Sequence, residues 1–225
     1  MFRKLQYISQ GLNSKEQLEN IQSLLDAGCE WIQLRFKNAS EDEFFEVAKL
    51  VKKLCDSYSA TFIINDNVEL AKKINTDGVH LGLQDMIVSE ARIILGENKI
   101  IGGTANTLGD VELRIHEKCD YIGLGPFRYT STKTNLSPVL GLNGYKKIMN
   151  EVSKRKTGVP VYAIGGISID DVEAIINTGV YGIAVSGAFT NHSNKKKLLQ
   201  SFNSILRPSV IPIPPFADGK SPVDF

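Results

Sequence analysis

Residues 31–55 read WIQLRFKNASEDEFFEVAKLVKKLC, and this stretch decides the fold because it joins a buried strand to an amphipathic helix. Residues 31–36 are mostly apolar and alternate in polarity toward their end, as a strand does. Ser40 and Glu43 then have the spacing of a capping box at the start of a helix. The helix that follows carries one apolar stripe, formed by Phe44, Val47, Ala48, Val51, Leu54 and Cys55.

The same unit of strand and helix recurs along the chain of 225 residues. Further short apolar runs predict buried strands at residues 5–9, 61–64, 78–81, 99–102, 120–125, 160–164 and 182–186. In the first helical segment, Ser14 and Gln17 predict the start and Gly28 predicts the end. Eight such units over residues 1–206 favour a catalytic domain with a single (β/α)8 TIM barrel over a doubly wound sheet.

Residues 207–225 differ in composition from the rest of the chain. Prolines at positions 208, 212, 214, 215 and 222 exclude a regular helix and a central strand. We therefore expect residues 207–225 to form an extended, proline-rich C-terminal tail, and we assign it no chemistry.

The composition is that of a soluble globular protein, with 42% hydrophobic and 23% charged residues. The 26 Lys and Arg residues nearly balance the 25 Asp and Glu residues, so no basic field would attract nucleic acid or an anionic membrane. The sequence predicts no membrane span and no signal peptide, and we expect a cytoplasmic protein that binds a small molecule. Cys29, Cys55 and Cys119 are widely spaced, which predicts reduced structural thiols rather than disulfides or a zinc site.

Polar side chains gather where the predicted strands end, which is the active-site end of such a barrel. In residues 31–37, one face is apolar and suits contact with the helices, whereas the other carries Gln33, Arg35 and Lys37. Because unpaired charge is costly at a barrel mouth, we expect these cations to bind an anionic ligand. A ladder of salt bridges at the rim is the alternative interpretation.

Two carboxylates follow the next two strands. Asp66 comes after Asn65 at the end of the run at residues 61–64, and Asp85 follows the run at residues 78–81. Mg²⁺ takes one or two carboxylates and completes its shell with water and phosphate oxygens, so the pair suggests a site for a metal and a phosphate. Each aspartate alone is equally explained as a helix cap or a turn residue.

The loop that begins after residues 120–125 and reaches Gly141 has the composition of an anion-binding lid. The hydroxyls of Thr130 and Thr132 lie beside Lys133 in the sequence, which predicts binding of phosphate or carboxylate. A solvated surface loop is the alternative interpretation.

The ends of the last two predicted strands are rich in small residues. Gly165, Gly166 and Ser186 predict a second anion site, because backbone N–H groups can approach a ligand closely there. A tight turn would explain either glycine alone.

Taken in order, these motifs resemble those of the thiamine phosphate synthase family over almost the whole chain. The family's Q-x-R-x-K, N-D, G-x-x-D and G-P…T-x-T-K motifs are matched in turn by Gln33-Leu34-Arg35-Phe36-Lys37, Asn65-Asp66, Gly82-Leu83-Gln84-Asp85, and Gly125-Pro126 with Thr130-Ser131-Thr132-Lys133. Ala163-Ile164-Gly165-Gly166-Ile167 and Val185-Ser186 complete the set. Six motifs in the same order are more specific than any one of them.

The resemblance implies a transferase that joins 4-amino-2-methyl-5-(diphosphooxymethyl)pyrimidine to a thiazole phosphate, carboxylated or plain, by dissociative loss of diphosphate. It implies Mg²⁺ on Asp66 and Asp85, with Arg35, Lys37 and Lys133 stabilising the departing diphosphate. The residues implied for the pyrimidine diphosphate are Gln33, Arg35, Lys37, Asn65, Thr104 and Lys133. Those implied for the thiazole phosphate are Thr130, Thr132, Gly166, Val185 and Ser186. The same binding motifs also contain Leu34, Phe36, Ser131 and Gly165.

Some positions depart from the family's pattern. Thr104 stands where serine is commoner, and Asn106 stands where histidine is frequent. The pair Phe127-Arg128 is unusual in the lid; Arg128 could add a further phosphate contact, but we favour a position in solvent. We expect His80 to be a hydrogen-bonded interior group rather than a catalyst.

Two other functions fit the same fold. One is the related thiazole tautomerase, an isomerase that needs no diphosphate or metal, and Pro126 occupies the position where we expect its histidine. The other is a non-catalytic barrel that binds thiazole phosphate for regulation, which has no use for Asp66, Asp85 and Lys37 together. The sequence leaves open whether the chain forms a homo-oligomer.

Overall fold

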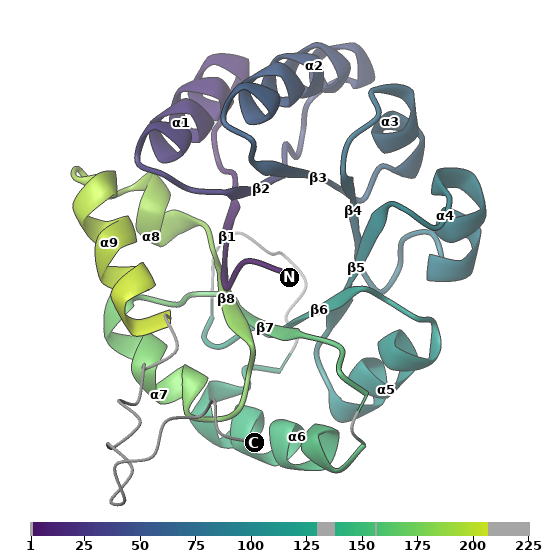
Figure 1. Ribbon diagram of the computed structural model, residues 1–225, viewed down its shortest axis with the longest axis vertical. Coiled ribbons are helices and arrows are strands. Elements are labelled where there is room, and N and C mark those ends of the chain that lie inside the picture. The colour runs from purple at the N-terminus through teal and green to yellow at the C-terminus, as the bar shows by residue number, and fades with distance from the viewer. Residues whose placement is uncertain (1, 130–137, 156, 207–225) are drawn as a thin grey trace, which may run out of the picture.

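The computed structural model describes residues 2–129, 138–155 and 157–206, in which parallel strands close into a barrel ringed by helices (Figure 1). Each strand pairs with the next along the chain, and the last pairs with the first, with Leu5 opposite Ile183. This closed ring confirms the predicted (β/α)8 barrel and excludes a doubly wound sheet, which has two open edges.

The predicted apolar runs all fall on strands. The strands are β1 (Leu5–Ile8), β2 (Trp31–Leu34), β3 (Thr61–Asn65), β4 (Gly78–Leu81), β5 (Ile100–Ala105), β6 (Tyr121–Leu124), β7 (Val161–Ile164) and β8 (Gly182–Val185). Strand β2 ends before Phe36 because its pairing with β3 stops at Leu34 and Ile64, whereas β5 continues past Gly102 to Ala105.

Helices alternate with the strands and pack on the outside of the barrel. They are α1 (Ser14–Asp26), α2 (Glu41–Ser57), α3 (Val68–Lys73), α4 (Val88–Leu95), α5 (Leu108–His116), α6 (Gly141–Lys154), the short η1 (Ile169–Asp171), α7 (Val172–Ile176), α8 (Gly187–Thr190) and α9 (Lys195–Leu206). The predicted cap of α2 is confirmed, since the Ser40 side chain accepts from the Glu43 N–H at 3.2 Å.

The predicted cap of α1 is wrong by one residue. Asn13 is the cap, because its backbone is extended and its side chain accepts from the Glu16 N–H at 2.9 Å. Ser14 is already helical, and its hydroxyl donates to the carboxylate of Glu43 on α2. At the other end Gly28 has a φ of 99°, so the predicted glycine stop is confirmed.

The apolar side chains form two layers. The larger layer lies between the outer face of the strands and the helices, and it contains the apolar stripes of α1 and α2. The smaller one fills the end of the barrel where the strands begin, with Trp31 packed edge-on against Tyr121 and Tyr162 at ring distances of 5.0 and 5.1 Å. Phe2 covers this aromatic layer, so the barrel is closed at that end and any site must open at the other.

Candidate active site

A chain of hydrogen-bonded polar side chains crosses the barrel interior next to the aromatic layer. Gln33 Nε2 on β2 donates to Gln6 Oε1 at 3.1 Å, and Gln6 Nε2 donates to the Tyr121 hydroxyl at 3.3 Å. His80 on β4 lies between the Tyr121 hydroxyl and Thr104 Oγ1, at 3.0 Å from each. We call these five residues the interior relay, and the place of His80 in it confirms the prediction for that residue.

The interior relay holds two predicted substrate-binding groups in defined positions. Gln33 and Thr104 are only 2% and 7% exposed, and each has a hydrogen-bond partner beneath it in the barrel. Burial raises the pKa of Tyr121, so its hydroxyl remains protonated and can donate as well as accept. With its added methyl group, Thr104 still places its hydroxyl 3.0 Å from His80 Nε2.

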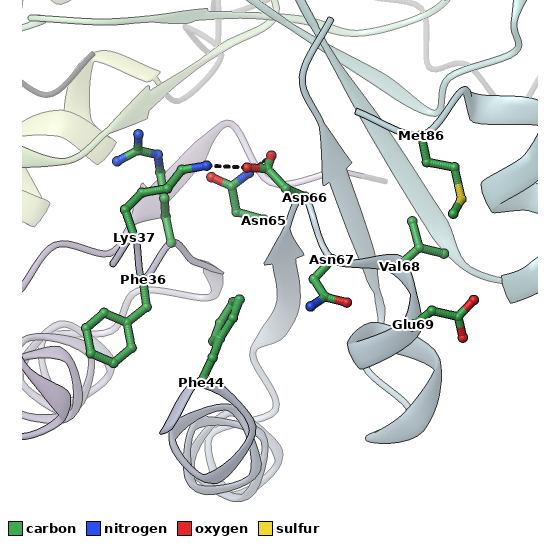
Figure 2. Close-up of a pocket in the computed structure, with 10 residues that line it drawn as sticks. Phe36, Lys37, Phe44, Asn65, Asp66, Asn67, Val68, Glu69 and Met86 are labelled. Carbon is green, nitrogen blue, oxygen red and sulfur yellow. Dashed lines mark hydrogen bonds and ion pairs between the residues drawn. The ribbon is translucent and has the colours of Figure 1, made fainter. Parts of the chain in front are cut away.

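At the rim, cations that follow β2 meet a carboxylate that follows β3. Figure 2 shows Lys37 and Asp66 pointing toward one another, with Lys37 Nζ 2.5 Å from Asp66 Oδ2. Burial lowers the pKa of Arg35, an effect that the charge of Asp66 opposes. The ion pair of Lys37 is one that the alternative of a salt-bridged ladder also predicts, so this contact does not exclude a structural role.

Asp66 and Asp85 interact, as their neighbouring strand ends predicted. Burial raises the pKa of Asp66, the nearby carboxyl of Asp85 raises it further, and Lys37 lowers it. Asp66 is not a helix cap, because Asn67 caps α3 by accepting from the Leu70 N–H at 2.9 Å. Asp85 does brace a turn, since its Oδ2 accepts from the Gly82 N–H at 2.6 Å.

An open pocket of about 420 Å³ lies beside these charges, between β2, β3 and the starts of α2 and α3 (Figure 2). It is lined by Arg35, Phe36, Lys37, Phe44, Asn65, Asp66, Asn67, Val68, Glu69 and Met86. The sequence did not predict five of these residues: Phe44, which by spacing belongs to the core stripe of α2, and Asn67, Val68, Glu69 and Met86. Phe44 packs edge-on against Phe36 at 6.5 Å, a contact that no local pattern indicates.

Leu34 lies elsewhere. Its side chain is fully buried in the core between the barrel and the helices, so only its backbone can meet a ligand.

The glycines after β7 lie in the left-handed region, with φ of 90° for Gly165 and 71° for Gly166. A Cβ at Gly165 would lie 2.7 Å from the Cβ of Pro126, so close packing alone requires that glycine. Val185 ends β8 inside the protein, and Ser186 is the residue before α8.

Arg128 is exposed, as expected, but its guanidinium is also held by a partner. Its guanidinium binds both carboxylate oxygens of Asp171 at 2.7 Å, and the side chain is 49% exposed. Nearby, Asn106 Nδ2 donates to the Gly125 carbonyl at 2.5 Å. Both side chains therefore tie the start of the long loop after β6 to neighbouring strand ends.

Thr130, Ser131, Thr132 and Lys133 lie outside the described residues, as does the predicted tail at residues 207–225. The described ends of the loop are held together, since the Leu140 N–H donates to Pro126 O and the Gly141 N–H donates to Phe127 O, both at 3.0 Å. The start and end of the loop therefore lie side by side.

Three features of the described chain bear on the remaining expectations. No helix in the described ranges combines the length and apolarity needed to cross a membrane. Within the same ranges, no three His, Cys, Asp or Glu side chains gather as a metal site, so Asp66 and Asp85 would need oxygen ligands from elsewhere. The cysteines are free and buried, and burial raises the pKa of Cys29 to about 11 and that of Cys119 to about 12.

Comparison with known proteins agrees with this geometry. The family model described as thiamine monophosphate synthase matches residues 6–189. The thiamine-phosphate synthase of Flavobacterium psychrophilum is 57% identical over 206 residues, which cover 92% of this chain and 100% of the relative. That of Flavobacterium johnsoniae is 55% identical over 211 residues, which cover 94% of this chain and 100% of the relative.

Solved structures also resemble this barrel. The thiamine phosphate pyrophosphorylase of Pyrococcus furiosus superposes with a TM-score of 0.78 at 33% identity, over 90% of this chain and 95% of that one. A structure of 3-hexulose-6-phosphate synthase superposes with a TM-score of 0.66 at 16% identity, a likeness that shows the fold alone. With a family model spanning most of the barrel and relatives that align over their whole length, the chain belongs to the thiamine monophosphate synthase family.

Proposed function

We propose that the open end of this barrel joins a pyrimidine diphosphate to a thiazole phosphate, with formation of thiamine phosphate and release of diphosphate. The activity is that named for relatives which are 55–57% identical to this chain. The observation that carries the proposal is the meeting of two carboxylates with Lys37 and Arg35 directly above a buried polar layer. This arrangement offers a polar floor for a heterocycle and charges for a diphosphate.

The pyrimidine ring would lie on the interior relay. Gln33 and Thr104 present an amide and a hydroxyl there, and both suit the hydrogen-bonding edge of an aminopyrimidine. Asn65 at the end of β3 lies next to the rim, where its amide donates to Asp66. Because these groups are already held by partners, little conformational entropy is lost when a ring binds.

The acidic pair fits Mg²⁺. Its donors are two interacting carboxylates, of which Asp66 lines the pocket, and Mg²⁺ commonly uses one or two carboxylates together with water and phosphate oxygens. A bound cation would also relieve the repulsion that raises the pKa of Asp66. When bound there, Mg²⁺ would offset the negative charge that develops on the departing diphosphate.

The protein's own cations would share this task. The bond between the pyrimidine methylene carbon and the diphosphate oxygen breaks, the electron pair leaves with the diphosphate, and the thiazole nitrogen then forms a bond to the methylene carbon. No side chain acts as a nucleophile, so Lys37, Arg35 and Lys133 would serve by stabilising charge on the leaving group. Lys133 is assigned from the sequence motif.

The second substrate would be anchored at the opposite side of the rim. Gly165, Gly166, Val185 and Ser186 end β7 and β8, and Thr130, Ser131 and Thr132 belong to the loop after β6. Backbone N–H groups at glycines can approach a phosphate closely. Holding the thiazole by its phosphate would keep its nitrogen within reach of the methylene carbon.

The decisive experiment supplies both precursors and measures release of diphosphate with and without Mg²⁺. We expect release that requires both substrates and stops when the metal is chelated. Isomerisation of the thiazole without diphosphate release would identify the tautomerase instead. Tight binding of thiazole phosphate without turnover would identify the regulatory barrel. A cytoplasmic location stays a prediction from the sequence.

A further inference from the structure

Arg128 binds three groups on the loop that follows β7. Its Nη1 and Nη2 donate to the two carboxylate oxygens of Asp171 at 2.7 Å, and Nη1 also donates to the Gly166 carbonyl at 2.7 Å. Its backbone N–H donates to the Gly165 carbonyl at 3.0 Å. One residue therefore binds the carbonyls of both successive glycines.

These contacts determine where two backbone N–H groups point. In a planar trans peptide the N–H points opposite to the C=O of the same unit. The Gly165 carbonyl shares its peptide with the N–H of Gly166, and the Gly166 carbonyl shares its peptide with the N–H of Ile167. Both N–H groups are therefore turned away from Arg128, and neither is hydrogen-bonded to any described residue.

The backbone conformation at Gly165 and Gly166 favours glycine, and the contact between Arg128 and Asp171 braces it. Both glycines have positive φ, which side chains rarely adopt, and with both carbonyls turned toward Arg128 the two N–H groups that follow face the other way. The brace is itself well held: the Asp171 carboxylate also accepts from the Ser168 N–H at 2.8 Å and from the Ser168 hydroxyl at 2.7 Å. The guanidinium lies 4.8 Å from the ring centre of Phe127.

We propose that Arg128 is a positioning residue for the thiazole phosphate. Arg128 acts through Asp171 and the carbonyls of Gly165 and Gly166 rather than by touching the phosphate. This inference rests on the proposed function, because it assigns the phosphate to the loop after β7. Both Nη atoms of the guanidinium already donate to Asp171 or Gly166, so these partners fix where the side chain lies. The unusual Phe127-Arg128 pair thereby gains a role.

The test compares Arg128→Gln with Asp171→Asn in steady-state assays that vary each substrate in turn. We expect both variants to raise KM for thiazole phosphate by about tenfold, since a loosened anchor misplaces the substrate. We expect kcat and KM for the pyrimidine diphosphate to stay within about twofold, because the described contacts for that substrate lie on β2 to β5 or just after them. Arg128→Lys keeps the charge but loses the fork, and should give an intermediate KM.

Asp171→Asn separates positioning from direct contact. If Arg128 bound the phosphate itself, loosening its partner would free the cation, and KM for thiazole phosphate would fall or stay the same. That result, or an equal rise in both KM values, would overturn the proposal. Ser168→Ala removes one bond to Asp171 but leaves the contact with Arg128, so its effect should be smaller than that of Asp171→Asn.

Two controls keep the outcome interpretable. Arg3→Gln breaks another exposed arginine–carboxylate pair, with Glu30 at 2.9 Å, at the far end of the barrel, and should leave both KM values unchanged. Thermal unfolding of every variant checks the fold, and Arg128→Lys still tests the idea if Arg128→Gln is unstable. If the unchanged chain and Arg3→Gln release no diphosphate, the proposed function fails; if only the predicted KM pattern is missing, the role of Arg128 fails.

Discussion

The two sides of the barrel rim shift the pKa of a carboxylate in opposite directions. At β3 and β4, burial and the nearby Asp85 raise the pKa of Asp66, and Lys37 only partly offsets them. At the loop after β7, burial acts to raise the pKa of Asp171, but hydrogen bonds from Arg128 and Ser168 lower it overall. A carboxylate whose charge remains poorly compensated is a candidate for holding a ligand, whereas one fully bound by protein donors braces the loop that carries it.

The strongest challenge to this contrast is Asp85→Ala. If Asp85 serves the ligand, turnover should fall by about 10²- to 10³-fold, the size expected for loss of one charge-stabilising group. The free energy of unfolding should fall by only about 1 kcal/mol, for loss of the bond from the Gly82 N–H, because no core packing is lost. Assays of diphosphate release and thermal unfolding measure both quantities.

Asp110→Ala is the matched control for that variant. Asp110 also accepts backbone N–H groups at this end of the barrel, from Asn106 at 2.9 Å and Thr107 at 2.8 Å, but it belongs to the cap of α5. It should lose about 1 kcal/mol of unfolding free energy and keep its turnover. Intact activity in Asp85→Ala with the melting loss of a core deletion would contradict the assignment.

Tyr121→Phe tests whether the pyrimidine side depends on the layer beneath it. Removing the hydroxyl takes a partner from both Gln6 and His80, and should cost about 1–3 kcal/mol of unfolding free energy. KM for the pyrimidine diphosphate should rise, and KM for thiazole phosphate should not. Tyr162→Phe loses a bond to the Arg3 carbonyl in the same aromatic layer but lies outside the interior relay. An identical KM pattern in both variants would reduce the interior relay to a structural role.

Asp66→Asn should separate stability from activity. A folded pKa above the unfolded value means that ionised Asp66 costs stability at neutral pH, and that this cost disappears as the pH falls through the folded pKa. In metal-free buffer the variant should therefore melt above the parent at pH 7, with the difference shrinking in acid, while turnover is lost. Mg²⁺ should raise the melting temperature of the parent but not of the variant. A variant that melts lower at pH 7 would contradict this account.

Asp171→Asn should have the smallest effect on stability, and its sign should be opposite to that of Asp66→Asn. A folded pKa below the unfolded value means that Asp171 adds stability above about pH 4, and that this contribution is lost as the pH falls toward the folded pKa. The variant should melt below the parent at pH 7, by less than about 1 kcal/mol because solvent screens the half-exposed Arg128. The difference in melting temperature should shrink as the pH falls below about 4, and a difference that stays constant there would show that the charge is not responsible.

Much of the site followed from local pattern. Alternation in the run after Trp31 placed Gln33 away from the helices, because successive side chains on a strand point to opposite faces. The acids after β3 and β4 were expected to meet because parallel strands that are neighbours in the barrel end at the same rim. The ordered motifs then added the family, which the comparisons confirmed.

Two features could not be predicted from such patterns: which residue caps α1, and which side of α2 reaches the pocket. Ser14 and Asn13 are both good caps, and the chain uses Asn13 because its backbone is the extended one at the turn into α1. Phe44 belongs to an apolar helical stripe by spacing, yet it lines the pocket because the start of α2 lies at the rim.

The alternating elements, the closed barrel and the chemistry of its strand ends could be predicted from the sequence, because they depend on periodicity and on residue type at short range. The pairing of polar groups could not, because it depends on tertiary contacts. Gln6 meets Tyr121 across 115 positions of sequence, and Arg128 meets Asp171 across 43. Closure of the barrel brings those side chains together, and no repeat in the sequence records a contact that depends on the position of every strand in between.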